Sequence, residues 1–292
     1  MTTTARVYRT LMRLLHSSVP RVDLAHLRFA QEASGWLITP GGRVACRSFS
    51  LRGLPLARLE PAPSDLPPDV CMLHLHGGGF VGGSMRYAKT MAKYLAASLG
   101  IRTLTVGYRL APEHPYPAAL QDAVAAYRYL LQRGYKKIIL VGESAGGGLI
   151  VSLAVRLREL DLPMPAGLYA LSPWADLACS GDSYGTIKDP SLRREPMLKF
   201  GALYANGLPL DDPRISPVYA DLTGLPPALI QVGEQEFLHS DAVLLGQSMK
   251  RQGVTCRVEC YKDMWHVFQA FAMPEARFAM ARAKLFCRDL LS

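Results

Sequence analysis

The sequence predicts an α/β fold built on a parallel, doubly wound sheet. Short apolar runs of strand type alternate with longer segments of helical periodicity along most of the 292 residues, and this alternation is typical of a parallel sheet between two layers of helices. Hydrophobic residues make up 49% of the chain and charged residues 20%, which is a globular composition. Near residue 144, a buried strand also runs directly into a helix through a sharp glycine-rich turn.

The first 40 residues are expected to form two helices outside this alternation, separated by the Ser-Ser-Val-Pro break at 17–20. An apolar stripe at helical spacing makes the first helix amphipathic, and we expect this helix to pack on the rest of the protein; the stripe consists of Val7, Leu11, Leu14 and Leu15. Three arginines without an acidic residue before Asp23 give the segment a faint likeness to a transit peptide. A structural helix is the preferred interpretation.

The elements that follow are justified by their periodicity and their flanking turns. An edge strand over 44–50 and a hairpin partner over 54–59 precede a proline-rich loop at 61–68. Strands are then expected over 70–75, 102–106, 138–141 and 166–171, and helices over 86–99, 118–133 and from 145 onward. The interval from about 178 to 219 breaks the rhythm and contains helical pieces around 196–206. The alternation of strands and helices then resumes with a strand over 228–232, a helix ending near Arg251, a strand over 254–261 and a C-terminal helix.

The turn near residue 144 matches the nucleophile-elbow pattern G-x-S-x-G over Gly142-Glu143-Ser144-Ala145-Gly146. Glycine two residues before and after Ser144 leaves room where strand and helix backbones crowd the turn. The alternative is a glycine-rich turn in which Ser144 merely caps a helix, and this pentapeptide alone does not decide between the two.

A glycine-rich loop follows the 70–75 strand. His76-Gly77-Gly78-Gly79 has the HGGG form, in which the N–H groups of Gly78 and Gly79, with that of Ala145, would stabilise negative charge on a carbonyl oxygen. The same loop fits the dinucleotide pattern G-x-G-x-x-G over 77–82, but no acidic residue follows between 85 and 112 to bind a ribose. His74 and His76 could begin a metal site, but no nearby carboxylate or cysteine completes it.

Hydrolases with such an elbow carry the nucleophile, the acid and the histidine in that order along the chain. His266 lies in a loop after the 254–261 strand and before the C-terminal helix. Three carboxylates follow the 228–232 strand: Glu234, Glu236 and Asp241. We choose Glu236 as the acid on its position and interpret Asp241 or Ser240 as a helix N-cap. Asp241 remains the alternative acid.

Together these motifs resemble the hormone-sensitive-lipase-like esterases, bacterial lipolytic family IV of the α/β-hydrolase superfamily. The matching stretches are HGGGF at 76–80, YRLAPE at 108–113, GESAGG at 142–147, SPW at 172–174, DPRISP at 212–217 and the His266 loop. The resemblance implies an α/β-hydrolase fold with a mostly parallel eight-stranded sheet flanked by helices. It also implies a helical cap from 1–40 and 178–219, and a catalytic domain from 41–177 and 220–292. Glu143 and Glu236 depart from the family pattern, which usually has aspartate at both positions.

A serine carboxylesterase for short- to medium-chain acyl esters is the function that the resemblance implies. Ser144 would attack a small-molecule ester, His266 would take its proton and Glu236 would orient the imidazole, without a metal or an organic cofactor. Two alternatives stay open. One is a non-catalytic small-molecule receptor on the same scaffold, like the plant gibberellin receptors, which lose the catalytic histidine that is present here. The other is a lipid or amide hydrolase.

Charge and cysteine usage narrow the partners further. The net charge is +9, but Lys and Arg are scattered and no dense basic run occurs, so we expect no nucleic-acid binding. No apolar run reaches the roughly 20 residues of a membrane span, and we expect no stable membrane association. The six cysteines include no C-x-x-C pair and are expected to be free thiols in a reducing cytoplasm. A homodimer is left open.

Overall fold

The computed structural model describes residues 1–292 except 18–23, 36–37, 40–41, 63–65 and 292. Its strands form one eight-stranded sheet in the order β1-β2-β4-β3-β5-β6-β7-β8. Their bounds are β1 (Val44–Leu51), β2 (Leu54–Pro61), β3 (Val70–Leu75), β4 (Thr103–Val106), β5 (Lys137–Glu143), β6 (Gly167–Leu171), β7 (Ala228–Gly233) and β8 (Cys256–Tyr261). From β4 to β8 all neighbours are parallel, whereas β2 runs antiparallel to β1 and β4. The expected mostly parallel eight-stranded sheet is confirmed.

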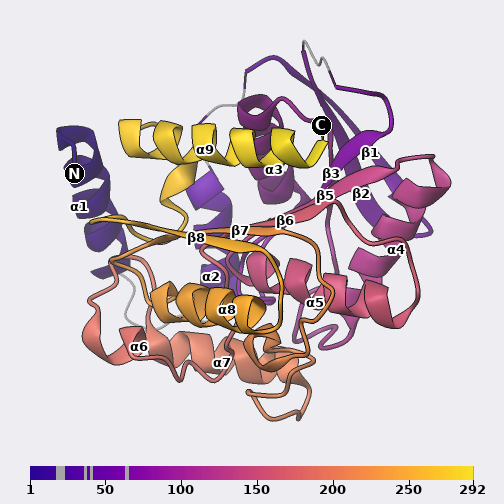
Figure 1. The fold of residues 1–292 in the computed structure, drawn as a ribbon. Helices are drawn as coiled ribbons and strands as arrows, with labels where there is room; N and C mark the ends of the chain where they lie inside the picture. The colour runs from indigo at the N-terminus through magenta and orange to yellow at the C-terminus, as the bar shows by residue number, and fades with distance from the viewer. Residues whose placement is uncertain (18–23, 36–37, 40–41, 63–65, 292) are drawn as a thin grey trace.

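Helices cover both faces of the sheet (Figure 1). On one face lie α3 (Met85–Leu99) and α9 (Pro274–Leu291); on the other lie α4 (Ala118–Gln132), α5 (Ala145–Glu159) and α8 (His239–Arg251). The remaining helical segments are α1 (Thr3–Ser17), α2 (Leu24–Ser34), α6 (Ser183–Thr186), α7 (Arg194–Ala205), and the 3-10 turns η2 (Pro217–Tyr219) and η3 (Phe268–Ala270). Among the helices in the described ranges, none combines the length and the hydropathy that a bilayer span requires.

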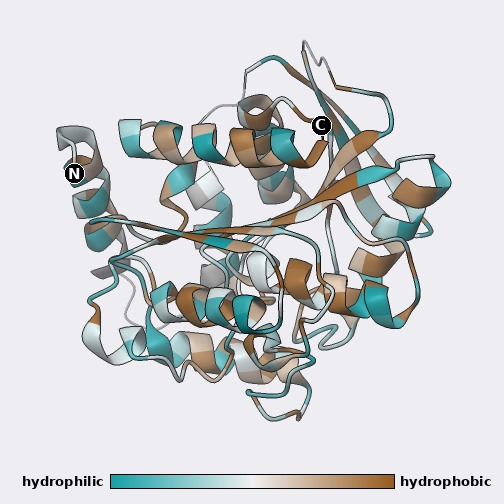
Figure 2. Ribbon diagram, in the orientation of Figure 1, coloured by the Kyte–Doolittle hydropathy of each residue, from teal (hydrophilic) through white to brown (hydrophobic). Residues whose placement is uncertain are grey.

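The central strands β5 and β6 are coloured mostly as hydrophobic in Figure 2, and they are apolar on both sides because helices cover both sides. In β5, Ile138 and Leu140 join the apolar cluster beneath α4, α5 and α8, while Ile139 and Val141 join the cluster beneath α3 and α9. Successive side chains of a strand point to opposite faces. Strand β5, which ends at Ser144, therefore contributes side chains to the core on both faces of the sheet. This burial on both faces holds the turn at the end of the strand in place.

Helix α1 packs on the rest of the protein, as expected, but its apolar stripe is not the face that is buried. Val7 and Leu14 are 63% and 60% exposed. The helix packs instead through the face that carries Ala5 and Tyr8, with the Tyr8 ring centroid 5.1 Å from that of Phe271. Apolar residues lie on two adjacent faces of this helix, and the face with the small Ala5 side chain permits the closer approach. The Leu15 side chain lies outside the described residues.

Candidate active site

Ser144 lies between the end of β5 and the start of α5. Its backbone angles are φ 56° and ψ −125°, a combination that is strained for a residue with a side chain. The turn is held by hydrogen bonds from Ser144 N–H to Leu171 O and from Trp174 N–H to Ser144 O, both 2.9 Å. The Ser144 side chain forms no capping hydrogen bond with α5, so its geometry does not match the helix-cap alternative.

The flanking glycines are there because backbones cross at van der Waals distance. A Cβ atom on Gly142 would overlap the carbonyl of Gly146, and one on Gly146 would overlap the carbonyl of Leu75. A Cβ on Gly148 would overlap the carbonyl of Trp174. Glycine is therefore required at the elbow for close approach rather than for loop flexibility.

The HGGG loop leaves the carboxyl end of β3 beside Ser144. Gly78 and Gly79 adopt φ values of 123° and 61°, which only glycine tolerates readily. Both line one cavity together with Ser144, and Ala145 is buried at the first position of α5. Within the described part of the chain, the amides of Gly78, Gly79 and Ala145 donate to no other protein group. Three backbone donors thus remain available near Ser144.

A buried carboxylate ties the elbow to this loop. Glu143 accepts a hydrogen bond from Gly77 N–H at 2.8 Å with one oxygen and contacts His74 Nε2 at 2.9 Å with the other. His74 Nδ1 in turn lies 2.8 Å from Thr105 Oγ1. His74 is therefore a hydrogen-bonded strand residue, as expected. Among the described residues no group of His, Cys, Asp and Glu could hold a metal.

His266 and Glu236 meet as the sequence predicts. His266 Nδ1 lies 2.7 Å from Glu236 Oε2, and Glu236 Oε1 accepts Gly233 N–H at 2.6 Å and Ser172 Oγ–H at 2.7 Å. Ser172 Oγ also accepts Val267 N–H at 3.1 Å. The Glu236 carboxylate is fully buried. Sequence reasoning missed the contribution of Ser172, and its only signal was its place in the SPW motif.

Ser144 and His266 line the same cavity, which has a volume of about 270 Å³. No hydrogen bond joins their side chains among the described residues. Such contacts are often long before a substrate binds. Most of the wall is apolar and comes from three sources: the N-terminal segment gives Met12, Gln31 and Ile38, the 178–219 interval gives Ser191, Leu192, Met197 and Phe200, and the sheet ends give Trp174, Val267, Ala270 and Phe271.

Asp241 lies elsewhere. Its Oδ2 accepts the N–H groups of Ala175 and Asp176 at 3.0 and 2.9 Å, and its Oδ1 accepts the Tyr184 hydroxyl at 3.0 Å. Burial raises the pKa of this carboxyl. The expected N-cap role of Asp241 or Ser240 is wrong, because α8 already begins at His239 and its N-cap position forms no side-chain hydrogen bond. Asp241 therefore sits in the first turn and anchors the loop after β6.

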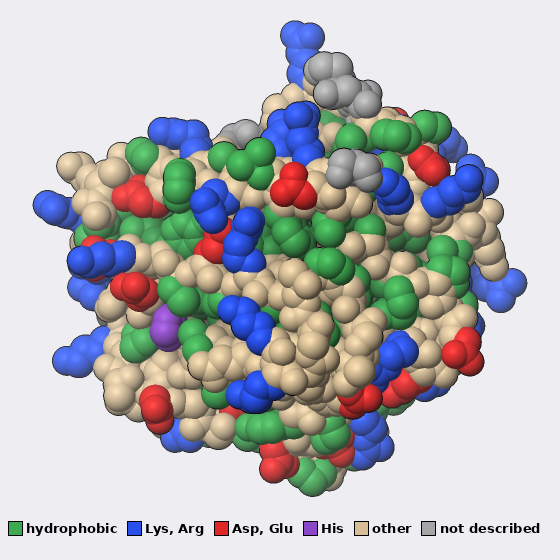
Figure 3. Space-filling model, in the orientation of Figure 1, with side chains coloured by type: hydrophobic (Ala, Val, Ile, Leu, Met, Phe, Trp, Pro, Cys, Tyr) green, Lys and Arg blue, Asp and Glu red, His purple; other side chains and the backbone are tan. Residues whose placement is uncertain are grey.

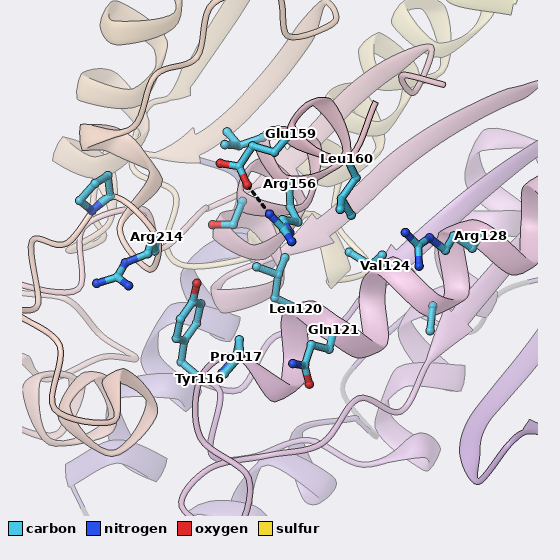
Figure 4. Close-up of a pocket in the computed structure, with 14 residues that line it drawn as sticks. Tyr116, Pro117, Leu120, Gln121, Val124, Arg128, Arg156, Glu159, Leu160 and Arg214 are labelled. Atoms are coloured by element: carbon cyan, nitrogen blue, oxygen red, sulfur yellow. Dashed lines mark hydrogen bonds and ion pairs between the residues drawn. The ribbon is translucent and has the colours of Figure 1, made fainter. Parts of the chain in front are cut away.

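A larger cavity, of about 590 Å³, lies between α4 and α5 (Figure 4). Arg214 and Tyr116 stand at one end of it and Arg128 at the other, with the Arg156–Glu159 ion pair between them. Its described lining includes Ser152 but no histidine. The carboxylate of Glu159 in this lining is bound by Arg156 at 2.8 Å, so the smaller cavity, which holds Ser144 and His266, is the candidate active site.

Comparison with known proteins agrees with the fold. A model of the family described as alpha/beta hydrolase fold matches residues 72–270. An acetyl-hydrolase of Streptomyces hygroscopicus is 38% identical over 265 residues, which are 89% of this chain and 86% of that protein.

Solved structures agree along the whole chain. An esterase of the bacterial hormone-sensitive lipase family superposes with a TM-score of 0.93 at 38% identity and covers 100% of this chain and 99% of its own. The structure of the esterase EstE5 soaked with p-nitrophenyl butyrate superposes with a TM-score of 0.92 at 34% identity, again over 100% and 99% of the two chains.

Proposed function

Because the chain belongs to the α/β-hydrolase family of the bacterial hormone-sensitive-lipase-like esterases and is a carboxylic ester hydrolase, we propose that Ser144, Glu236 and His266 form its catalytic triad. The observation that carries the proposal is the 2.7 Å contact of His266 with the buried Glu236, at a cavity that also holds Ser144. This support comes from the site itself, since a fold alone does not fix a function.

The proposed reaction has two steps. In the first, Ser144 Oγ attacks the ester carbonyl while His266 Nε2 takes its proton, and Glu236 stabilises the imidazolium through Nδ1–H. The N–H groups of Gly78, Gly79 and Ala145 stabilise the oxyanion. His266 then gives the proton to the leaving alcohol. In the second step His266 activates a water molecule, which hydrolyses the acyl-enzyme and frees Ser144.

We propose short- to medium-chain acyl groups for the substrate. The bounded cavity of about 270 Å³ supports this, because Trp174, Met197 and Phe200 limit its extent. The acetyl group in the name of the Streptomyces relative and the butyryl ester soaked into EstE5 support the same range. The contact of His266 with Glu236 argues against the receptor alternative, which lacks the catalytic histidine.

The cap remains a proposal. Its support is that residues from both 1–40 and 178–219 line the cavity of Ser144. We also propose a cytoplasmic location, supported by the six free cysteines. The homodimer stays a prediction that light scattering on the purified protein would test.

The test of the function is turnover of p-nitrophenyl esters from acetyl to hexanoyl. We expect Ser144→Ala to lose the activity, because removal of the nucleophile from such a triad costs on the order of 10⁶ in kcat. Ser152→Ala, in the larger cavity, is the matched control and should retain it. An emulsified triglyceride, assayed in parallel, separates an esterase from a lipase. Full activity in Ser144→Ala would refute the mechanism.

A further inference from the structure

Helix α2 holds the HGGG loop from outside. Arg28 Nε donates to Val81 O at 2.8 Å, and Gln31 Nε2 donates to Gly77 O at 3.0 Å. Glu32 accepts a hydrogen bond from the Ser84 hydroxyl. Residues three and four positions apart share one face of a helix, so the loop is bound at its start, middle and end by a single face of α2.

The carbonyl that Gln31 binds belongs to the peptide unit of an oxyanion donor. Gly77 C=O and Gly78 N–H are part of the same planar trans peptide, so they point in opposite directions. A hydrogen bond that fixes the Gly77 oxygen therefore fixes the direction of the Gly78 N–H. The second proposed donor, Gly79, is oriented by the loop itself, because Gly78 O accepts Val81 N–H at 3.2 Å and Gly82 N–H at 2.8 Å.

Two side chains hold the Gly77 oxygen. Besides Gln31, His76 Nδ1 lies 2.7 Å from it. Burial lowers the pKa of His76 to about 4, so the ring is neutral near pH 7, and the carbonyl acceptor selects the tautomer with a proton on Nδ1. The N-terminal segment thus holds the Gly77 carbonyl through Gln31, and the loop holds it through His76.

Space around Gln31 is tight. A Cβ atom on Gly78 or on Gly82 would overlap the Gln31 amide group. The side chain is only partly exposed and lines the cavity of Ser144. The two glycines therefore give this amide its access to the Gly77 carbonyl.

We infer that Gln31 is a positioning residue that aims the Gly78 N–H at the developing oxyanion, so that docking of α2 on the loop is a condition for full catalysis. The inference rests on the proposed function. It links the N-terminal segment to the rate of the reaction and not only to the shape of the pocket, since an oxyanion donor acts mainly in the transition state.

The test compares Gln31→Met and Gln31→Glu with Phe29→Ser. Met keeps the length of the side chain without a donor, Glu places a negative charge against the Gly77 carbonyl, and Phe29 is a 75% exposed residue of the same helix. We expect Gln31→Met to lower kcat by roughly ten-fold with KM little changed, less than the 10² to 10³ for complete loss of a donor. The kcat of Gln31→Glu should fall further than that of Gln31→Met, and the kcat and KM of Phe29→Ser should match those of the wild type.

Affinity for a phenylboronic acid, which forms a tetrahedral adduct with the serine, should fall in Gln31→Met by the same factor as kcat/KM. A loss confined to KM would overturn the inference, because it would indicate a direct substrate contact. Unchanged kcat in a folded Gln31→Met, with activity lost in Ser144→Ala, would also overturn it while leaving the triad intact. Retained activity in Ser144→Ala would instead refute the proposed function.

Discussion

Glu236 is held by three partners at once, and this suits it to fix an imidazole. Its two oxygens meet His266, Gly233 N–H and Ser172. In Glu236→Gln an amide NH2 group replaces one oxygen. It faces either the two donors Gly233 N–H and Ser172 O–H, or His266 Nδ1, which must then accept and leaves the proton on Nε2. We expect kcat to fall by up to about 10⁴ with KM little altered. Steady-state kinetics on a p-nitrophenyl ester measures this loss. The kcat of Glu236→Asp, whose side chain is shorter, should lie between those of the wild type and Glu236→Gln.

Asp241→Asn is the matched control for this experiment. The amide oxygen can replace Oδ2 as acceptor of the two backbone N–H groups, but the NH2 group stands where Oδ1 accepts the Tyr184 hydroxyl, so that buried hydrogen bond must reverse or be lost. We therefore expect a loss of about 1–3 kcal/mol in the free energy of unfolding, measured by urea denaturation, and near-normal turnover. If Asp241→Asn is inactive and Glu236→Gln turns over normally, the assignment of the acid is wrong.

Among single residues, the sequence predicted those that belong to a motif, but not those whose role depends on contacts between distant parts of the chain. The elbow pattern and the chain order led to Ser144, Glu236 and His266. Ser172 lies 64 residues before Glu236 and 95 before Val267, and its role depends on a hydroxyl that donates to one and accepts from the other. No local pattern encodes such a pair of contacts.

At the scale of elements, periodicity identified the helices and strands but not always the face that is used. The strands of the central sheet were predicted because burial on both sides leaves a continuous apolar run. Helix α1 has more apolar surface than the rest of the protein covers. Which face of the helix packs is therefore decided by a tertiary contact, that of Tyr8 with Phe271. The start of α8 was misplaced for a related reason: no capping side chain marks it.

Removal of residues 1–40 tests the cap. The segment contacts the loop after His266 through Thr39, whose N–H donates to Ala270 O at 2.8 Å, and it contributes Met12 to the cavity. We expect the truncated protein to change its acyl-chain preference or to aggregate through newly exposed apolar surface. A chain-length series and light scattering measure these effects.

Leu14→Ser is the control for the truncation, because this side chain is 60% exposed and its substitution leaves the cavity wall in place. We expect it to retain the wild-type preference. A truncated protein that stays monodisperse and keeps the preference of the full chain would contradict the cap.

At the scale of the whole molecule, the order of strands was beyond the reach of sequence patterns. β4 lies between β2 and β3 although it follows both along the chain, and such a crossover is set by long-range packing. On the face in Figure 3, Lys and Arg side chains are spread among acidic ones.

Global stability should depend on pH through His76. Its ring is 1% exposed and stacks on Tyr108 with centroids 4.1 Å apart. Burial lowers its pKa from 6.5 to about 4. Above pH 6.5 the ring is neutral in both states, so the unfolding free energy is at its full value. As the pH falls from 6.5 toward 4, the unfolded chain binds a proton that the folded one does not, and the free energy falls by at most about 3 kcal/mol.

Urea denaturation across that interval measures how steeply the unfolding free energy changes with pH. This slope reflects the number of protons taken up on unfolding, and we expect that number to be smaller by about one in His76→Gln than in the wild type. An NMR titration of the wild-type imidazole provides a second measurement that needs no variant. The His76 signal should stay unshifted down to the acid end of the interval, because protonation of the folded protein must leave a charge in an apolar site. A His76 signal that titrates near 6.5, or equal slopes in the two proteins, would show that the ring is solvated and that its hold on the Gly77 carbonyl is weak.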